Sequence, residues 1–163
     1  MSRETLTRYR TKVIEDFIMI EGYINAIISK SYLGKVSKKF FWEVLQDEYF
    51  NFGLRTNILE KILKELSLIE KPNPLINDLR RLSKLRNYFA HCNTAFFDDL
   101  EANSRGGIPD PRKTGEYLNF EEIYKEFNEK IKLVSDQLIL IMDKLGILFI
   151  VDEETKNITV ILE

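Results

Sequence analysis

Hydrophobic residues recur at helical spacing along most of this sequence. In the first segment one series repeats every seven residues: Leu6, Val13, Ile20 and Ile27. A second series interleaves with it: Arg10, Phe17 and Ile24. This spacing paints one face of a helix, which we expect over residues 4–30. A second, short helix is expected from Ser37, a residue type that caps helices well, to about Tyr49.

Three later segments carry the same helical signature. Apolar positions between residues 54 and 69 predict a third helix, closed by two prolines. A fourth helix is expected over residues 75–91. In the last long segment two seven-residue series interleave and predict a helix over residues 120–145. Such a seam needs another helix packed against it.

The periodicity stops in the middle of the chain and again near its end. No period survives over residues 92–119, where glycines and prolines predict an irregular loop of unusual length. Two β-rich runs, 147–151 and 158–162, predict a hairpin. We therefore expect a mainly α fold, a bundle of four to five helices over residues 1–146, followed by a short β-hairpin over residues 147–163.

Composition narrows the possible chemistry. The chain has 163 residues, 44% of them hydrophobic and 31% charged, which suits one compact domain. Its single cysteine, Cys92, cannot form an internal disulfide, and its single histidine, His91, excludes catalysis by several histidines of one chain. One cysteine and one histidine do not make a four-ligand zinc site without carboxylates. We expect no metal and no cofactor.

Targeting signals are not evident. The first residues are basic, but no uninterrupted apolar run with a small-residue cleavage site follows them. The longest apolar runs are a handful of residues, well below the roughly 18 to 20 that span a bilayer. We therefore expect a cytoplasmic protein without a membrane partner.

Charge is unevenly distributed along the chain. The formal net charge is −2, which gives no global reason to bind nucleic acid. Residues 116–163 contain 5 basic and 11 acidic side chains, so the positive excess lies earlier. Arg80, Arg81, Lys84 and Arg86 lie within seven residues, and the first three are the candidates for contacting RNA phosphates. For each of these three singly, a solvated helix face is the more common explanation.

A helical wheel of the fourth segment places a charge on its apolar stripe. The stripe consists of Leu75, Leu79, Leu82 and Phe89, with Leu85 and Ala90 at its edges. Arg86 falls in the middle of it. An unpaired charge in a core is costly, so the guanidinium needs a carboxylate, a ligand or a partner surface. A structural ion pair, or a stem that reaches solvent, explains it as well as a function does.

Asn87 and His91 lie four residues apart, and therefore on one face of the same helix. An imidazole changes its charge near neutral pH, which suits it to act as an acid or base, and a nearby arginine suits a phosphate oxyanion. A histidine at the carboxyl end of a helix is also often only a capping cation. Spacing alone leaves both interpretations open.

The string RNYFAH at residues 86–91 resembles the Arg-(Asn/Asp/His)-x3-His signature of the HEPN superfamily, small all-helical domains of prokaryotic toxins, antiviral ribonucleases and regulators. Arg86 matches the arginine, Asn87 the polar residue after it, and His91 the histidine. The stretch from FGL at residues 52–54 up to the motif resembles the mannitol-operon-repressor-like branch. The resemblance covers about residues 5–145.

The resemblance implies a homodimer in which two copies of the motif face each other across a cleft. Catalytic HEPN domains cleave RNA without a metal ion and leave a 2′,3′-cyclic phosphate. Carried over, His91 would be the general base or acid, Arg86 would stabilise the phosphoryl oxygens, and Asn87 would orient the imidazole or the phosphate. An antitoxin or regulatory protein is a further expected partner.

Two features distinguish this chain from the catalytic toxin members of the superfamily. Many toxin members carry, two residues after the histidine, a tyrosine that accepts a nucleotide modification, and this chain has Asn93 there, so that variant of the family is not expected. The mannitol-operon-repressor-like branch is associated with transcriptional control or protein interaction. A non-catalytic regulatory module that binds RNA or protein is therefore the alternative to an endoribonuclease.

Overall fold

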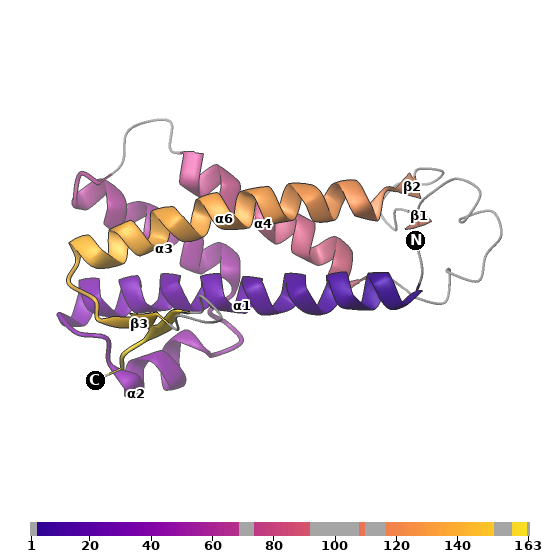
Figure 1. Cartoon of the computed structure of the whole chain (residues 1–163). Coiled ribbons are helices and arrows are strands. Elements are labelled where there is room, and N and C mark those ends of the chain that lie inside the picture. The colour runs from indigo at the N-terminus through magenta and orange to yellow at the C-terminus, as the bar shows by residue number, and fades with distance from the viewer. Residues whose placement is uncertain (1–2, 69–73, 92–107, 110–116, 152–157, 163) are drawn as a thin grey trace. The chain divides into compact units, whose positions relative to one another are not determined.

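The computed structural model describes residues 3–68, 74–91, 108–109, 117–151 and 158–162 (Figure 1). The fold is mainly helical with a short antiparallel strand pair near the C-terminus, which confirms the predicted fold class. In chain order the elements are α1 (Arg3–Leu33), α2 (Lys38–Phe40), η1 (Phe41–Leu45), α3 (Phe52–Glu65), α4 (Pro74–Ala90), β1 (Ile108–Pro109), β2 (Tyr117–Leu118), α6 (Phe120–Lys144), β3 (Phe149–Val151) and β4 (Ile158–Val160).

The chain divides into two compact units, and α1, α4 and α6 each pass through both. The first unit consists of Met1–Phe17 and Arg81–Lys132, the second of Ile18–Arg80 and Leu133–Glu163. We expected a boundary at residue 146, between a helical domain and the hairpin. The two units do not test that boundary, which stays a prediction.

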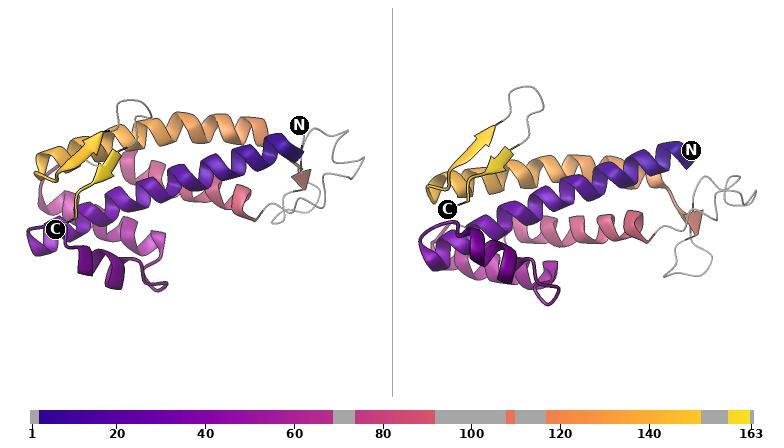
Figure 2. Two further views of the ribbon diagram at one scale, coloured as in Figure 1. Left: turned by 60° about the horizontal axis from the view of Figure 1, so that its bottom comes forward. Right: turned by 90° about the horizontal axis from the view of Figure 1, so that it is seen from below.

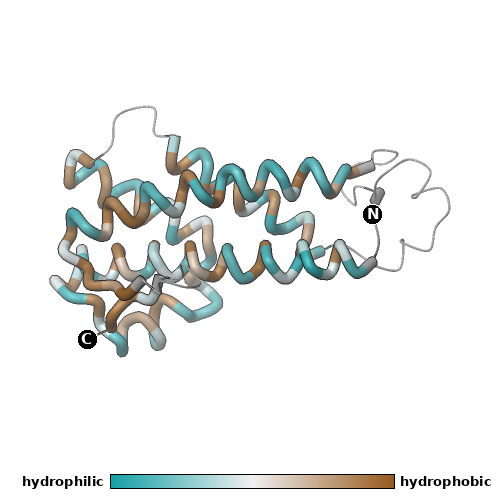
Figure 3. Tube along the Cα trace, viewed as in Figure 1, coloured by the Kyte–Doolittle hydropathy of each residue, from teal (hydrophilic) through white to brown (hydrophobic). Residues whose placement is uncertain are grey.

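In the first unit, parts of α1, α4 and α6 each contact the other two. The ring of Tyr9 on α1 stacks on that of Tyr124 on α6, with centroids 3.8 Å apart. Phe89 on α4 packs edge-on against Phe120 on α6 at 5.2 Å. Among the described residues of this unit, the buried apolar ones are Leu6, Val13, Phe17, Leu82, Leu85, Phe89, Phe120, Phe127 and Ile131. Hydrophobic and hydrophilic positions alternate along these helices with the predicted period (Figure 3).

In the second unit α1 is the central element, and every residue from 23 to 29 is buried. Apolar side chains of other elements complete this core: Leu45, Leu59, Leu63, Leu75, Leu79, Val134, Leu138 and Met142. The strands β3 and β4 pair antiparallel with Phe149 opposite Val160, as the predicted hairpin requires (Figure 2). Burial raises the pKa of Tyr23 on α1, and the nearby Ser135 side chain opposes this in part.

An arginine joins three elements of the second unit. Arg55 on α3 is almost completely buried, and its Nη1 lies 3.4 Å from Oε1 of Glu21 on α1. Its Nη2 donates to the carbonyl oxygen of Leu45, the last residue of η1, at 2.6 Å. One side chain therefore neutralises a carboxylate of α1 and satisfies the end of η1.

The second predicted helix is shorter than expected and is not a single α-helix. The Ser37 hydroxyl caps α2 by accepting from the Phe40 amide, as predicted. The π-helical turn η1 follows and ends at Leu45, whereas the predicted helix reached Tyr49. The Asp47 carboxylate accepts a hydrogen bond from the Tyr49 amide and forms a turn instead.

Helix α3 also ends earlier than predicted, at Glu65 rather than near residue 69. Ser67 adopts a left-handed φ of 53°, and the Leu68 amide donates to the Leu63 carbonyl in a helix-ending motif. Pro74, expected to close this helix, is instead the first residue of α4, where a missing amide hydrogen costs nothing.

The long irregular segment predicted over residues 92–119 contains regular structure, so that prediction is wrong in part. β1 pairs antiparallel with β2, with Ile108 opposite Leu118. Strands of two residues are too short to show a period of two in the sequence. Because the segment follows His91 directly, we also expect it to be mobile and to lie at the mouth of the motif. Most of it, residues 92–107 and 110–116, lies outside the described residues.

Candidate functional site

The motif residues lie on the last turns of α4. The predicted stripe of this helix is buried: Leu75, Leu79, Leu82, Leu85 and Phe89. Arg86 lies within the stripe and is half-buried. Because a charge in this position is costly without a partner, the contacts of its guanidinium show what holds it there.

The guanidinium of Arg86 contacts an aromatic ring. Its Cζ lies 4.7 Å from the centroid of the Phe17 ring on α1, which is a cation–π contact. Its Nε is buried and has no hydrogen-bond partner among the described residues. No described carboxylate forms an ion pair with it. Of the two structural alternatives, partial exposure fits a stem that reaches solvent, and the ion pair is not formed with any described residue.

Asn87 is half-buried and His91 is exposed, just after the last residue of α4. The His91 amide donates to the Asn87 carbonyl at 3.0 Å, which continues the helical bonding to the end of the motif. These two residues share a face, as predicted. Helical geometry separates Arg86 from His91 by about 7.5 Å along the axis and about 140° around it.

One further cation, absent from the predicted site, meets the end of α4. Nη2 of Arg10 on α1 donates to the carbonyl oxygen of Ala90, the residue before His91, at 3.2 Å. Arg10 is exposed. The signal in the sequence was its place in one seven-residue series with Phe17 and Ile24, which puts it on the face of α1 that packs.

The basic cluster predicted to contact RNA is largely paired with carboxylates. Arg81 donates to both carboxylate oxygens of Glu126 on α6, through Nε at 2.7 Å and Nη2 at 2.6 Å. Nη2 of Arg80 lies 3.1 Å from Glu60 on α3. Lys84 is exposed and forms no ion pair with a described residue. The structure therefore gives Arg80 and Arg81 a structural partner each, and RNA contact by the three stays a prediction.

The pair between Arg81 and Glu126 makes a pH dependence testable. The hydrogen bonds from Arg81 hold the pKa of Glu126 below its usual 4.5. Because the pKa of Glu126 is lower in the folded protein than in the unfolded chain, the pair stabilises the fold at pH values above 4.5. This stabilisation is lost as the pH falls below 4.5. Both side chains are partly exposed, at 43% and 33%, so we expect about 0.5 kcal/mol for Glu126→Gln at pH 7.

Thermal unfolding of the Glu126→Gln variant and of wild type between pH 7 and pH 3 measures this contribution. The difference in stability should shrink as the pH falls below 4.5. The matched control is Glu129→Gln, an exposed carboxylate on the same helix. A difference that grows toward acid would contradict the assignment.

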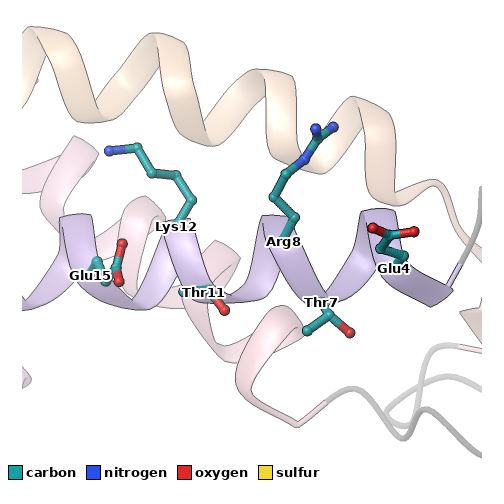
Figure 4. Close-up of a pocket in the computed structure, with 6 residues that line it drawn as sticks. All are labelled: Glu4, Thr7, Arg8, Thr11, Lys12 and Glu15. Atoms are coloured by element: carbon teal, nitrogen blue, oxygen red, sulfur yellow. The ribbon is translucent and has the colours of Figure 1, made fainter.

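Two hollows of the described surface are lined by residues other than those of the motif. An open groove of about 810 Å³ runs along α1, lined by Glu4, Thr7, Arg8, Thr11, Lys12 and Glu15. Arg8 and Lys12 extend from one side of the helix and Thr7 and Thr11 from the other (Figure 4). A smaller hollow of about 290 Å³ is lined by residues of α1 and α3, the turn after α3 and Leu145. No described motif residue lines either of them.

Metal ligation and membrane insertion find no support in the described residues. Within the described ranges, no three His, Cys, Asp or Glu side chains are grouped as a metal ion would require. None of the helices in the described part of the chain is both long enough and apolar enough to cross a membrane.

Comparison with protein-family models, with curated proteins and with solved structures found no match to this chain. The HEPN resemblance therefore depends on the motif at residues 86–91, on the stretch that precedes it and on its place at the end of a helix. It stays a prediction about the class of protein.

Proposed function

We propose that this chain is a metal-independent endoribonuclease of the toxin or antiviral-defence type that acts as a homodimer in the cytoplasm. The motif at residues 86–91 supports the proposal, and one observation carries it. The half-buried guanidinium of Arg86 contacts the Phe17 ring and forms no ion pair with a carboxylate among the described residues. An RNA phosphate carries the opposite charge and presents oxygens that match a guanidinium.

In the proposed reaction the ribose 2′-hydroxyl attacks the adjacent phosphorus and displaces the 5′-oxygen of the next nucleotide. The products are a 2′,3′-cyclic phosphate and a 5′-hydroxyl. His91 takes the proton from the 2′-hydroxyl as general base, or gives one to the leaving oxygen as general acid. Arg86 stabilises the charge that develops on the phosphoryl oxygens, and Asn87 orients the imidazole or the phosphate.

A homodimer solves a geometric difficulty of this site. One reaction needs both a base and an acid, and each chain has one histidine. Within one helix, Arg86 and His91 also leave the axis about 140° apart, so they do not converge easily on one phosphate. A second copy of the motif would supply the second imidazole and place an arginine opposite each histidine.

Incubation of the purified protein with single-stranded and structured RNA in EDTA tests the proposal. We expect products with 2′,3′-cyclic phosphate ends, detected by mass spectrometry, and a loss of cleavage of at least about 100-fold in His91→Ala. Glu129→Gln, purified in the same way, controls for a contaminating ribonuclease, because it changes an exposed residue on α6. Intact RNA across both classes of substrate, or equal cleavage by His91→Ala, would reject the endoribonuclease.

The alternative is a non-catalytic regulatory module of the mannitol-operon-repressor-like type, bound to RNA, an antitoxin or another protein. The pairing of Arg81 with Glu126 and of Arg80 with Glu60 favours it, because it leaves less free positive charge for a substrate strand. In the same assay this module would leave RNA intact, whether or not RNA binds.

A further inference from the structure

The end of α4 carries a cation that the motif does not include. Arg10 projects from α1, and its Nη2 donates to the Ala90 carbonyl at 3.2 Å. Ala90 is the last residue of α4, and His91 follows it directly. The carbonyl end of a helix bears a partial negative charge, which holds a guanidinium in place. Arg10 therefore contacts the residue that directly precedes the only histidine of the chain.

Arg10 differs from the arginines of the predicted basic cluster in what it contacts. Arg81 and Arg80 each have a carboxylate partner, Glu126 and Glu60. Arg10 forms no ion pair with a described carboxylate. A guanidinium has five N–H donors, and the Ala90 carbonyl accepts from one nitrogen of it. With respect to the described residues, this exposed arginine therefore keeps most of its donors for an anion.

The helix that carries Arg10 is fixed in place by aromatic packing next to it. Tyr9 stacks on Tyr124 at 3.8 Å, with an angle of 8° between the ring planes. Phe89, next to Ala90, packs edge-on against Tyr124 with centroids 6.3 Å apart. Both the backbone of Arg10 and the carbonyl that it contacts are thus set by one aromatic cluster. A rigid backbone lowers the entropy lost when a side chain binds a ligand.

We propose that Arg10 is an RNA-binding residue of the motif site and contacts a backbone phosphate beside the one that His91 acts on. This inference rests on the proposed function and deepens it, because it names a further contact to the same substrate. It moves the phosphate-binding surface from Arg80 and Arg81, which have carboxylate partners, to Arg10 and Arg86, which form no ion pair with a described residue.

The binding of a fluorescent single-stranded 2′-O-methyl RNA, which lacks the attacking hydroxyl, tests the proposal. Affinity is measured by anisotropy over a range of salt concentrations. Arg10→Gln keeps an amide that can donate to the Ala90 carbonyl but removes the charge, whereas Arg10→Lys keeps the charge. We expect Arg10→Gln to weaken binding about tenfold and to reduce the salt slope by about 0.7, and Arg10→Lys to restore the slope.

The control is Lys125→Gln, which removes an exposed cation of α6 and should leave the slope unchanged. The proposal is overturned if Arg10→Gln binds RNA like wild type, or if the salt slope falls in Arg81→Gln but not in Arg10→Gln. Arg10 is then only a helix cap. Cleavage by wild type that is lost in His91→Ala would keep the proposed function in that case. If wild type neither binds nor cleaves RNA, the proposed function fails and this inference fails with it.

Discussion

Replacement of Arg86 by methionine should strongly reduce the proposed RNA cleavage and leave the fold intact. Methionine has a similar length, is apolar, and removes both the charge and the buried Nε that has no partner among the described residues. The lost cation–π contact with Phe17 is worth about 0.5–2 kcal/mol, which better burial on the apolar stripe offsets. Loss of the group that stabilises a developing oxyanion reduces kcat by about 10²–10³-fold.

Two measurements on the same preparation separate the possible roles of Arg86. Thermal unfolding reports the fold, and initial rates of RNA cleavage report the site. Arg86→Lys should retain part of the activity, because an ammonium supplies charge without the paired donors of a guanidinium. Lys125→Met, at an exposed position of α6, is the matched control for the change to methionine. A methionine variant that unfolds more easily and still cleaves at the wild-type rate would make Arg86 a structural residue.

The helices of this protein were predictable because burial follows the spacing of apolar residues. Most positions of the seven-residue series of α1 and α6 are buried, and both helices start and end close to the expected residues. The end of α3 was not predictable, because it depends on a left-handed Ser67, a backbone state that the side chain does not announce. The pairing of β1 with β2 involves too few residues to leave a pattern.

Side-chain partners were harder to predict than helices. The wheel placed Arg86 on an apolar stripe, where the structure has it. The carboxylate partners of Arg80 and Arg81 lie 20 and 45 residues away in sequence, so no local spacing relates an arginine to its partner. Arg55 was missed although the same wheel applies to it, since it lies among the buried Phe52, Thr56 and Leu59 of α3. An arginine within an apolar stripe thus marks a position that needs a partner, without saying whether the partner is a residue or a ligand.

Replacement of Arg55 by alanine should destabilise the protein far more than the loss of any of its exposed ion pairs. It leaves the Glu21 carboxylate without its cation and the Leu45 carbonyl without its donor, in a place where the arginine side chain is 7% exposed. Breaking a buried pair costs about 3–5 kcal/mol, and the 23% exposure of Glu21 puts the expected loss near the lower value. The midpoint temperature of thermal unfolding should fall by roughly 10 °C for a chain of this size.

The matched control for Arg55→Ala is Arg80→Ala, which removes an ion pair of the same chemistry from the surface. Arg80 is 51% exposed and its partner Glu60 is 25% exposed, so its loss should cost about 0.5 kcal/mol or less. The difference between the two variants measures what burial adds to one arginine–glutamate pair. Equal losses of stability in the two variants would mean that water reaches the Arg55–Glu21 pair, as it reaches a surface pair.

A double variant then separates the loss of the hydrogen bond to Leu45 from the combined effects of the unpaired Glu21 charge and the lost packing. Glu21→Leu with Arg55→Met buries no charge and keeps much of the volume of both side chains. Since an apolar pair often replaces a buried ion pair at little cost, this variant should be more stable than Arg55→Ala. The Leu45 carbonyl still lacks its donor, so we expect about 1–2 kcal/mol of the loss to persist. A double variant as unstable as Arg55→Ala would assign the whole effect to the end of η1, and the contact with Glu21 would then contribute nothing to the stability of this unit.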